Sequence, residues 1–458
     1  MARSILVAAV LLAATLALVS GKEEGLLGSI ASLLEPPKTV IITVRTGIGS
    51  ALASVDPTTC PTRTDRINKV VDALQQNSLT TLAPVINLLN GVLGCVFRVL
   101  WITNEIVVDN CPPALIPVIR ALPCVLSVVE ELVFPIPQPS PTADSANNTQ
   151  AAGWGQAKIG APAVWSTNNT GQNIVVATID SGVLYTHEAL IGNYRGSYGW
   201  YDPISFAATP YDDNGHGTHT MGSLAGSKGI GVAPGAKWMA CKGCSSTSCA
   251  QSKLLACAQF ILCPTDTNGY NKDCSKAPHV VSNSWGGGRG LTYFQSAIDA
   301  WVAAGIIPVF AAGNSGPSCS SNVSPGDVAN AIEVGASDIN DALGSFSSRG
   351  PSSSGIIKPD ISAPGVSIRS AWNTDNVTYK SYSGTSMASP QVAGTIALML
   401  SANRNMTFSA VKAVLSSTAK TDNLPPSGGS CGGTSDYQFP NNQFGYGRVN
   451  AQAAVSAL

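Results

Sequence analysis

The stretch Ile174-Val-Val-Ala-Thr-Ile-Asp-Ser-Gly182 is a short β-branched run that ends in an aspartate and a turn. Similar apolar runs follow it, and helical stretches such as 217–225 and 293–304 lie between them. The further strand candidates are Val280–Ser284, Ile306–Ala311 and Ala331–Gly335. This alternation predicts a three-layer α/β domain with a mainly parallel central sheet. Functional sites in such sheets form at the carboxyl ends of the strands.

The composition limits the partners and the compartment. Only 12% of the 458 residues are charged and the formal net charge is −1, so nucleic acid and anionic membranes are not expected as partners. Residues 1–21 combine Arg3 with the apolar run Ile5–Val19, which predicts a cleaved signal peptide and secretion. The run is shorter than the roughly 20 residues of a membrane span, so we prefer this interpretation to a membrane anchor.

Cysteines and glycosylation sequons agree with an extracellular protein. Twelve cysteines favour disulfide bonds in an oxidising compartment. Asn-x-Ser/Thr sequons, each a weak signal alone, suggest a glycoprotein. They begin at Asn147, Asn168, Asn322, Asn376 and Asn405.

Three further regions follow the signal peptide. Residues 22–134 are apolar and are predicted to form a mostly helical pro-region, with helical spacing around 66–76, 82–101 and 113–132. Its four cysteines suggest two disulfides with three alternative pairings; they are Cys60, Cys95, Cys111 and Cys124. Residues 135–153 are rich in proline and small polar residues and are typical of an exposed linker. Residues 154–458 form the predicted α/β domain.

Four side chains in this domain stand where serine-dependent hydrolysis needs them. Asp180 ends a buried strand, although a turn aspartate is the plain alternative. His216 lies between glycines at a helix start and is the candidate base. Ser386, also at a helix start, is the candidate nucleophile, the alternative being a helix-capping serine. Asn314, in a glycine-rich turn, could donate to an oxyanion.

The blocks around these residues resemble the subtilase family of serine peptidases. They are Val176-Ala-Thr-Ile-Asp-Ser-Gly-Val183, His216-Gly-Thr-His-Thr220, Ala311-Ala-Gly-Asn314 and Gly384-Thr-Ser-Met-Ala-Ser-Pro390. Trp154-Gly155 and Ile159-Gly-Ala-Pro-Ala-Val-Trp165 are most similar to members of the bacillopeptidase F type. The resemblance covers about residues 154–458.

The resemblance implies a secreted serine endopeptidase that is made as a zymogen and forms an acyl-enzyme. Asp180, His216 and Ser386 would be its triad, in the subtilisin order, and Asn314 its oxyanion donor. Two walls would hold the substrate, and they consist of Ser284, Trp285, Gly286, Ala311, Ala312 and Gly313. The expected partners are protein and peptide substrates and the chain's own pro-region, and we expect a monomer. An inactive binding protein would require a lost catalytic group, and an α/β-hydrolase esterase would require Gly-x-Ser-x-Gly at the nucleophile.

No cofactor is expected. A zinc site at Cys241-x-x-Cys244 is less favoured than disulfides because the spacing within residues 241–274 is irregular. The family resemblance implies that structural calcium can bind, with Asp360 and the pair Asp212 and Asp213 as candidate acids. No run has a self-sufficient calcium-ligand spacing, so no metal site is predicted.

Overall fold

The computed structural model describes residues 36–137, 140–141, 153–426 and 428–458. The predicted signal peptide and most of the predicted linker lie outside these residues. The chain forms two compact units. The smaller contains the residues up to Asp56 and Val71–Leu132, and the larger contains Pro57–Val70 and Val133–Leu458.

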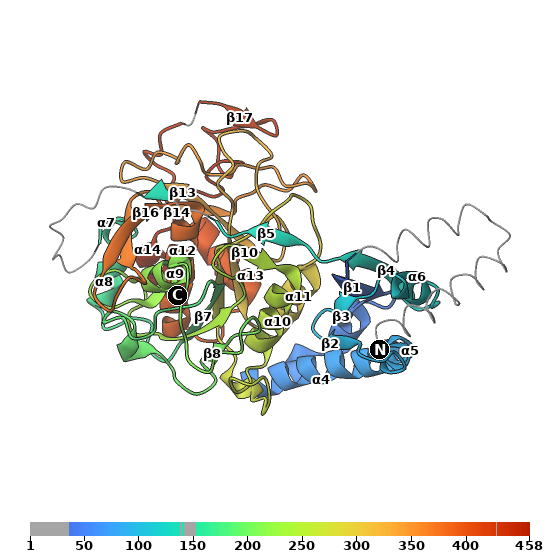
Figure 1. The fold of residues 1–458 in the computed structure, drawn as a ribbon. Coiled ribbons are helices and arrows are strands. Elements are labelled where there is room, and N and C mark those ends of the chain that lie inside the picture. Colours follow the sequence, from blue (N-terminus) through green and yellow to red (C-terminus); the bar gives the residue numbers. More distant parts are fainter. Residues whose placement is uncertain (1–35, 138–139, 142–152, 427) are drawn as a thin grey trace. The chain divides into compact units, whose positions relative to one another are not determined.

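The larger unit is built on a seven-stranded sheet in the order β14-β13-β12-β11-β7-β9-β8 (Figure 1). Every pair of neighbouring strands in it is parallel. The strands are β7 (Val175–Asp180), β8 (Trp200–Tyr201), β9 (Lys237–Lys242), β11 (Val280–Asn283), β12 (Ile307–Ala311), β13 (Ile332–Ser337) and β14 (Ile361–Pro364). The predicted strands are thus confirmed, with shifts of a few residues at their ends.

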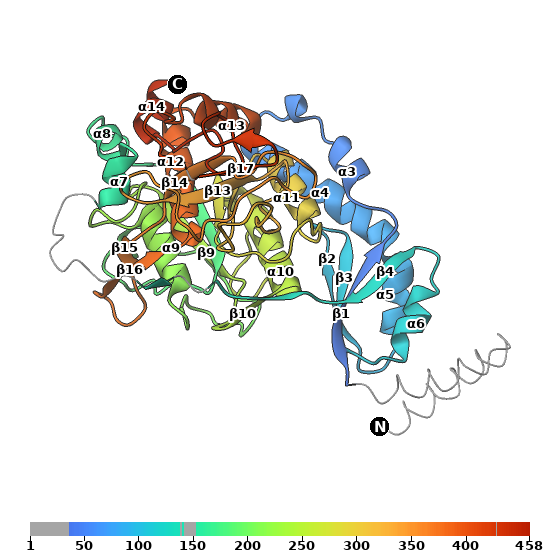
Figure 2. The same cartoon turned by 90° about the horizontal axis from the view of Figure 1, so that it is seen from above.

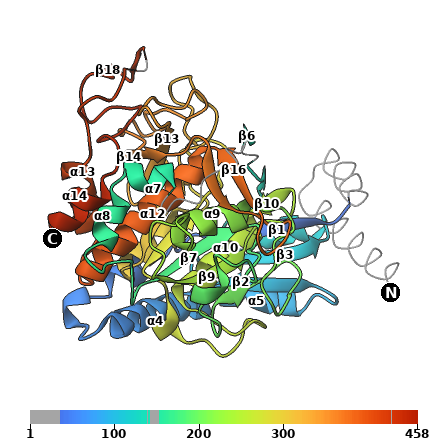
Figure 3. The same cartoon turned by 90° about the vertical axis from the view of Figure 1, so that its left-hand side faces the viewer.

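Helices cover both faces of this sheet. Helices α9 (His216–Ala225) and α12 (Thr385–Ala402) lie on one face, and α10 (Gln251–Leu262) and α11 (Gln295–Ala303) lie on the other (Figure 2). Figure 3 shows α9 and α12 side by side, and the two helices pack on each other. The other helices of the unit are α7 (Trp154–Lys158), α8 (Ala161–Trp165), α13 (Phe408–Ser417) and α14 (Ala451–Ser456). The predicted three-layer α/β fold is therefore confirmed.

The core of this unit explains why α12 has no polar face. All residues from Thr385 to Leu400 are buried, and side chains such as Val392 and Ile396 pack in one cluster with Val176 and Val309 of the sheet. Full burial of such a side chain stabilises the fold by about 1.5–3 kcal/mol. The helix is therefore fixed firmly enough to hold polar groups at its first turn.

Short elements complete the larger unit. Its 3-10 helices are η1 (Pro57–Thr59), η2 (Ile191–Asn193) and η3 (Cys274–Lys276). Its short strands are β5 (Val133–Pro135), β6 (Ser140–Pro141), β10 (Ser248–Ala250), β15 (Ile368–Ala371), β16 (Tyr379–Ser383), β17 (Ser430–Cys431) and β18 (Thr434–Ser435).

The smaller unit corrects the prediction of a mostly helical region. It contains a four-stranded antiparallel sheet in the order β2-β3-β1-β4. Its elements are β1 (Lys38–Val44), α3 (Gly49–Ala53), α4 (Arg63–Thr81, whose first turns belong to the larger unit), α5 (Ala83–Asn90), β2 (Val96–Leu100), β3 (Glu105–Cys111), α6 (Leu115–Arg120) and β4 (Val125–Glu130). Two of the predicted helical stretches, 82–101 and 113–132, end in the strands β2 and β4. The reason is that short apolar runs do not distinguish a buried strand from a helix.

Disulfides occur in the larger unit. The bridges are Cys241–Cys257, Cys244–Cys249, Cys263–Cys274 and Cys319–Cys431. The alternative of zinc at Cys241 and Cys244 is wrong, because each of these sulfurs is bonded to another cysteine. The two disulfides suggested for the first region do not form, since Cys60, Cys95, Cys111 and Cys124 are not bridged.

The sequons differ in accessibility. Asn168, Asn376 and Asn405 are exposed, whereas Asn322 is buried and offers no room for a glycan. Asn147 lies outside the described residues. Within the described ranges, none of the helices has the length and apolar character needed to cross a membrane.

Candidate active site

Asp180 and His216 meet at the carboxyl end of strand β7. Asp180 is the last residue of β7 and His216 is the first of α9. His216 Nδ1 lies 2.7 Å from Asp180 Oδ1, and both side chains are almost fully buried. The second carboxylate oxygen accepts a hydrogen bond of 3.1 Å from Thr220. The carboxylate therefore fixes both the orientation of the imidazole and the nitrogen that carries its proton.

Glycines flank His216 for a steric reason. Gly215 has φ of +104°, a conformation that L side chains rarely adopt. A Cβ on Gly217 would lie only 2.1 Å from the carbonyl oxygen of Gly182. The chain can therefore bring His216 against Asp180 only with glycine on both sides.

The electrostatic environment of His216 favours its protonated form. Burial alone disfavours the imidazolium, but the Asp180 carboxylate, with a smaller contribution from Asp212, outweighs burial and raises the pKa of His216. Within the part of the chain that the structure describes, His216 Nε2 has no hydrogen-bond partner. This nitrogen can therefore accept a proton.

Asp212 organises the loop before His216 and is not an open metal ligand. Its carboxylate accepts hydrogen bonds from Gly215 N at 2.8 Å, Ser181 Oγ at 2.9 Å and Thr218 N at 2.9 Å. The neighbouring Asp213 pairs with Lys242 at 2.6 Å.

The third candidate calcium acid is also engaged. Asp360 lies 2.7 Å from Lys358 Nζ and 2.6 Å from Lys412 Nζ. Among the residues that the structure describes, no group of three or more His, Cys, Asp or Glu side chains is suited to a metal ion. Lysines thus supply the positive charge that a cation would bring to Asp360.

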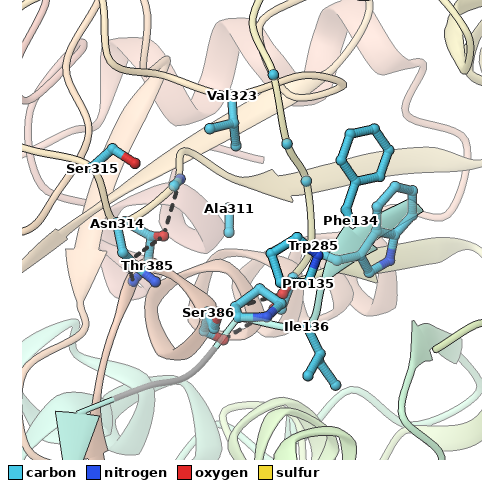
Figure 4. A pocket seen from close by; sticks show the side chains of 16 residues that line it. Phe134, Pro135, Ile136, Trp285, Ala311, Asn314, Ser315, Val323, Thr385 and Ser386 are labelled. Atoms are coloured by element: carbon cyan, nitrogen blue, oxygen red, sulfur yellow. Dashed lines mark hydrogen bonds between the residues drawn. The ribbon is translucent and has the colours of Figure 1, made fainter. Parts of the chain in front are cut away.

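Ser386 stands in the first turn of α12, where its backbone N–H lies at the positive end of a long buried helix. Its Oγ donates to the carbonyl oxygen of Ser284 at 3.3 Å. Asn314 Oδ1 accepts from Thr385 N at 2.9 Å and from Thr385 Oγ1 at 3.0 Å, as the dashed lines in Figure 4 show. With Oδ1 held in this way, Nδ2 of Asn314 is the group that can donate to a substrate oxygen.

Most of the predicted substrate-binding residues line one cavity. It has a volume of about 520 Å³. The predicted residues that line it are Ser284, Trp285, Gly286, Ala311, Gly313, Asn314 and Ser386 (Figure 4). Ala312 does not line it; it is fully buried, and its N–H donates to Val334 O at 3.0 Å. Asp180 and His216 are also absent from the lining.

A segment of the chain itself forms part of the lining of this cavity. Phe134, Pro135, Ile136 and Pro137 are among the lining residues. Strand β5 pairs antiparallel with β10, so that Phe134 lies opposite Cys249, and Ile136 N donates to Thr247 O at 3.0 Å. The phenyl ring of Phe134 is 5.4 Å from that of Tyr293 and lies over Gly287, where a Cβ would be 2.2 Å from it.

The backbone pairing of this segment lies beside a wall implied by the family resemblance, Ser284–Gly286. Its antiparallel partner is Ser248–Ala250, and Ser284–Gly286 lines the cavity. Beyond the cavity, Ser140 pairs with Ser383, three residues before Ser386. The chain thus has paired segments on both sides of the candidate nucleophile.

Sequence reasoning missed three parts of the site. They are the strand Ser248–Ala250, the Gly287–Gly288 turn and Val323. The run of three glycines from Gly286 to Gly288 was a signal, because adjacent glycines permit close approach of another chain. Nothing in the local sequence marks Val323 as a pocket residue.

Comparison with known proteins identifies the fold and the chemistry. Residues 171–447, more than half of the chain, match the model of the subtilase family. The chain belongs to the subtilase family. It is 40% identical over 336 residues to Bacillopeptidase F of Bacillus subtilis (strain 168), covering 68% of this chain and 22% of that protein. It is 35% identical over 315 residues to Subtilisin E of the same strain, covering 67% of this chain and 72% of the relative.

A third relative matches almost over its whole length. Subtilisin of Bacillus pumilus is 35% identical over 313 residues, which cover 67% of this chain and 99% of the relative. The resemblance found in the sequence motifs is therefore confirmed. The subtilase described here is a serine-type endopeptidase.

Proposed function

We propose that this subtilase hydrolyses peptide bonds through Asp180, His216 and Ser386, with Asn314 as an oxyanion donor. The observation that carries the proposal is the buried contact of 2.7 Å between Asp180 Oδ1 and His216 Nδ1. It leaves Nε2 of His216 as the proton acceptor. Ser386 Oγ would attack the substrate carbonyl and transfer its proton to Nε2, which would then protonate the leaving amine. Water would cleave the resulting acyl-enzyme by the same path.

The negative charge that develops on the carbonyl oxygen requires donors. The backbone N–H of Ser386, at the start of α12, and Nδ2 of Asn314 are the donors that we assign. A side-chain donor of this kind is worth about 2.7–4 kcal/mol of transition-state stabilisation, a value known from subtilisin itself. Because Thr385 holds Asn314, this donor is oriented before a substrate arrives.

We further propose that the chain is a zymogen. The segment Phe134–Pro137 lines the same cavity as Ser386, and its backbone pairs with β10 as an extended peptide would. A covalently attached segment competes with external substrate at a high effective concentration. Cleavage after Pro137 would release it, and this bond lies in the predicted linker region.

Secretion is part of the same proposal. The support is the apolar run Ile5–Val19 in the sequence and four disulfides in the larger unit, which are stable in an oxidising compartment. The exposed sequons Asn168, Asn376 and Asn405 are the positions at which a glycoprotein form would carry glycans.

A serine-reactive phosphonate tests the mechanism. In the matured protein we expect a covalent adduct on Ser386, and His216→Ala should abolish it. An adduct on another serine, or no adduct in a mature protein that also fails to cleave casein, would contradict the proposed triad. Sequencing of the mature N-terminus should give a start just after Pro137, and a start before residue 130 would contradict the proposed maturation.

A further inference from the structure

The cavity beside Ser386 has two walls that a third segment connects. One wall contains Ser284–Gly286, and the segment Ala311–Asn314 supplies the other through Ala311, Gly313 and Asn314. Val323 N donates to Ala312 O at 3.1 Å, which ties the third segment to the second wall. Gly287 N donates to Ser324 O at 2.9 Å, which ties it to the loop after the first wall. The residues 323–324 therefore form the closed end of the space between the walls.

The side chain of Val323 projects into this space. A Cβ on Gly286 would lie 2.9 Å from Cγ2 of Val323. A Cβ on Gly313, in the opposite wall, would lie 3.0 Å from Cγ1 and 3.1 Å from Cγ2. The isopropyl group is thus in contact with both glycine walls at once. It is half-buried and faces the cavity near Ala311 (Figure 4).

The position of Val323 is rigid. Its neighbours Asn322 and Ser324 are buried on either side of it. Ser324 Oγ accepts from Leu291 N at 2.8 Å and donates to Asp327 Oδ2 at 3.1 Å. A β-branched side chain has few rotamers, so Val323 has little freedom to swing out of the pocket when a substrate enters.

The walls also lack charge. No Asp, Glu, Lys or Arg is among the described residues that line the cavity. A charged substrate side chain would therefore lose water there without gaining an ionic partner. The segment Phe134–Pro137, which lines the cavity, has neutral side chains throughout, and its last residue, Pro137, carries only a small ring.

We propose that Val323 blocks the end of the pocket and restricts the substrate residue before the cleaved bond to small, uncharged side chains. This inference rests on the proposed function, in which Ser386 attacks the bond that follows this residue. A phenyl or long aliphatic side chain would have to displace the isopropyl group, which the two walls and the backbone hydrogen bonds hold in place.

Paired peptides test the proposal with matured full-length enzyme. Two p-nitroanilides, Phe-Pro-Ile-Ala and Phe-Pro-Ile-Phe, retain the side chains of Phe134–Ile136 at the first three positions. Active enzyme is counted by phosphonate titration. We expect kcat/KM for the alanine peptide to exceed that for the phenylalanine peptide by about tenfold or more, the scale on which apolar pockets discriminate size. In Val323→Gly, the ratio should shift toward phenylalanine by about tenfold or more.

Two further variants complete the design. Val323→Ala also enlarges the pocket, and alanine leaves the backbone less flexible than glycine does. It should shift the ratio in the same direction by a smaller factor. Val328→Gly is the matched control, because Val328 is also half-buried and lies five residues further on but does not line the cavity. Its ratio should equal that of the parent.

Two results would overturn the proposal. One is a parent enzyme that cleaves the phenylalanine peptide as well as the alanine peptide. The other is an unchanged ratio in both Val323 variants. Failure of the proposed function would look different, because neither peptide would then be cleaved and Ser386 would take no phosphonate.

Discussion

Two buried acid–base pairs of the larger unit have almost the same geometry and different consequences. Asp180 and His216 lie 2.7 Å apart, with side chains 3% and 1% exposed. Asp360 and Lys358 also lie 2.7 Å apart, with side chains 8% and 0% exposed. Each acid lies at a strand of the same sheet, Asp180 at the end of β7 and Asp360 immediately before β14.

The difference lies in the base and in its surroundings. Histidine can lose its proton near neutral pH, and His216 has one ring nitrogen without a partner among the described residues. Lys358 Nζ is engaged in a second bond, which it donates to Ala331 O at 2.9 Å. A short, buried ion pair is therefore not in itself a sign of catalysis. The sign is a base that can cycle between protonation states and has a ring nitrogen left to accept a proton.

The largest expected effect is on activity, which should depend on Asp180 and not on Asp360. Asp180→Asn should reduce kcat/KM by roughly 10⁴-fold, the size found for this change in other serine peptidase triads, because the imidazole loses its orientation and the proper tautomer. Peptide hydrolysis per titrated active site measures this. Asp360→Asn is the matched control and should leave that value unchanged. Equal losses in both variants would contradict the assignment of roles.

The same two variants should differ in stability in the opposite sense, with the larger loss in Asp360→Asn. Asp360→Asn leaves the ammonium group of Lys358 buried without its carboxylate, and breaking such a pair costs about 3–5 kcal/mol. Urea unfolding of the phosphonate-inhibited protein, which cannot digest itself, measures the loss. A smaller loss in Asp360→Asn than in Asp180→Asn would show that the lysine pair is not the structural one.

The pairs should also respond differently to pH. His216 accepts a proton only when neutral, and its pKa is raised, so activity should rise with pH through a midpoint above the ordinary histidine value of about 6.5. Burial raises the pKa of Asp360, but Lys358 and Lys412 outweigh burial and lower it. Its contribution to stability is therefore present above about pH 4 and is lost as the pH falls further.

Profiles of kcat/KM and of unfolding free energy against pH, recorded side by side, check both statements. In Asp360→Asn the acid loss of stability should be smaller, while the activity profile should keep its midpoint. An activity midpoint clearly below 6.5 would contradict the raised pKa of His216.

The smallest expected effect concerns Asp212. Its carboxylate contributes to the raised pKa of His216, so Asp212→Asn should move the acid midpoint of kcat/KM to lower pH. Asparagine retains one oxygen as an acceptor for the loop amides that Asp212 holds. An unmoved midpoint would assign the shift to Asp180 alone.

The candidate triad could be found from the sequence because its residues stand at the ends of regular elements. Asp180 ends a β-branched run, His216 follows a glycine at a helix start, and Ser386 stands in the first turn of an apolar helix. Such positions depend on local patterns of a few residues. The three-layer fold could also be predicted from local patterns, because strands and helices alternate along the chain.

What could not be predicted depends on contacts between distant loops. Val323 faces the pocket because its backbone bonds to Ala312 and that of Ser324 to Gly287, and no local pattern encodes such a crossing. Asp360 was a candidate calcium acid in the sequence. Its second partner, Lys412, lies far along the chain, so no local pattern reveals that this acid is already paired. In the smaller unit, runs such as Val125–Glu130 became strands through pairing with β1, a choice that apolar spacing leaves open.

The strand β10 has a consequence for the kind of protein that this enzyme can digest. It receives Val133–Pro135 through the backbone, so any guest must straighten over several residues before it can be cut. Native proteins meet that condition only where a loop can open, and damaged or loosened chains meet it readily. Two of the enzyme's own loops are closed by the bridges Cys244–Cys249 and Cys263–Cys274. The bridges restrict how far these two loops can open toward the active site of another copy.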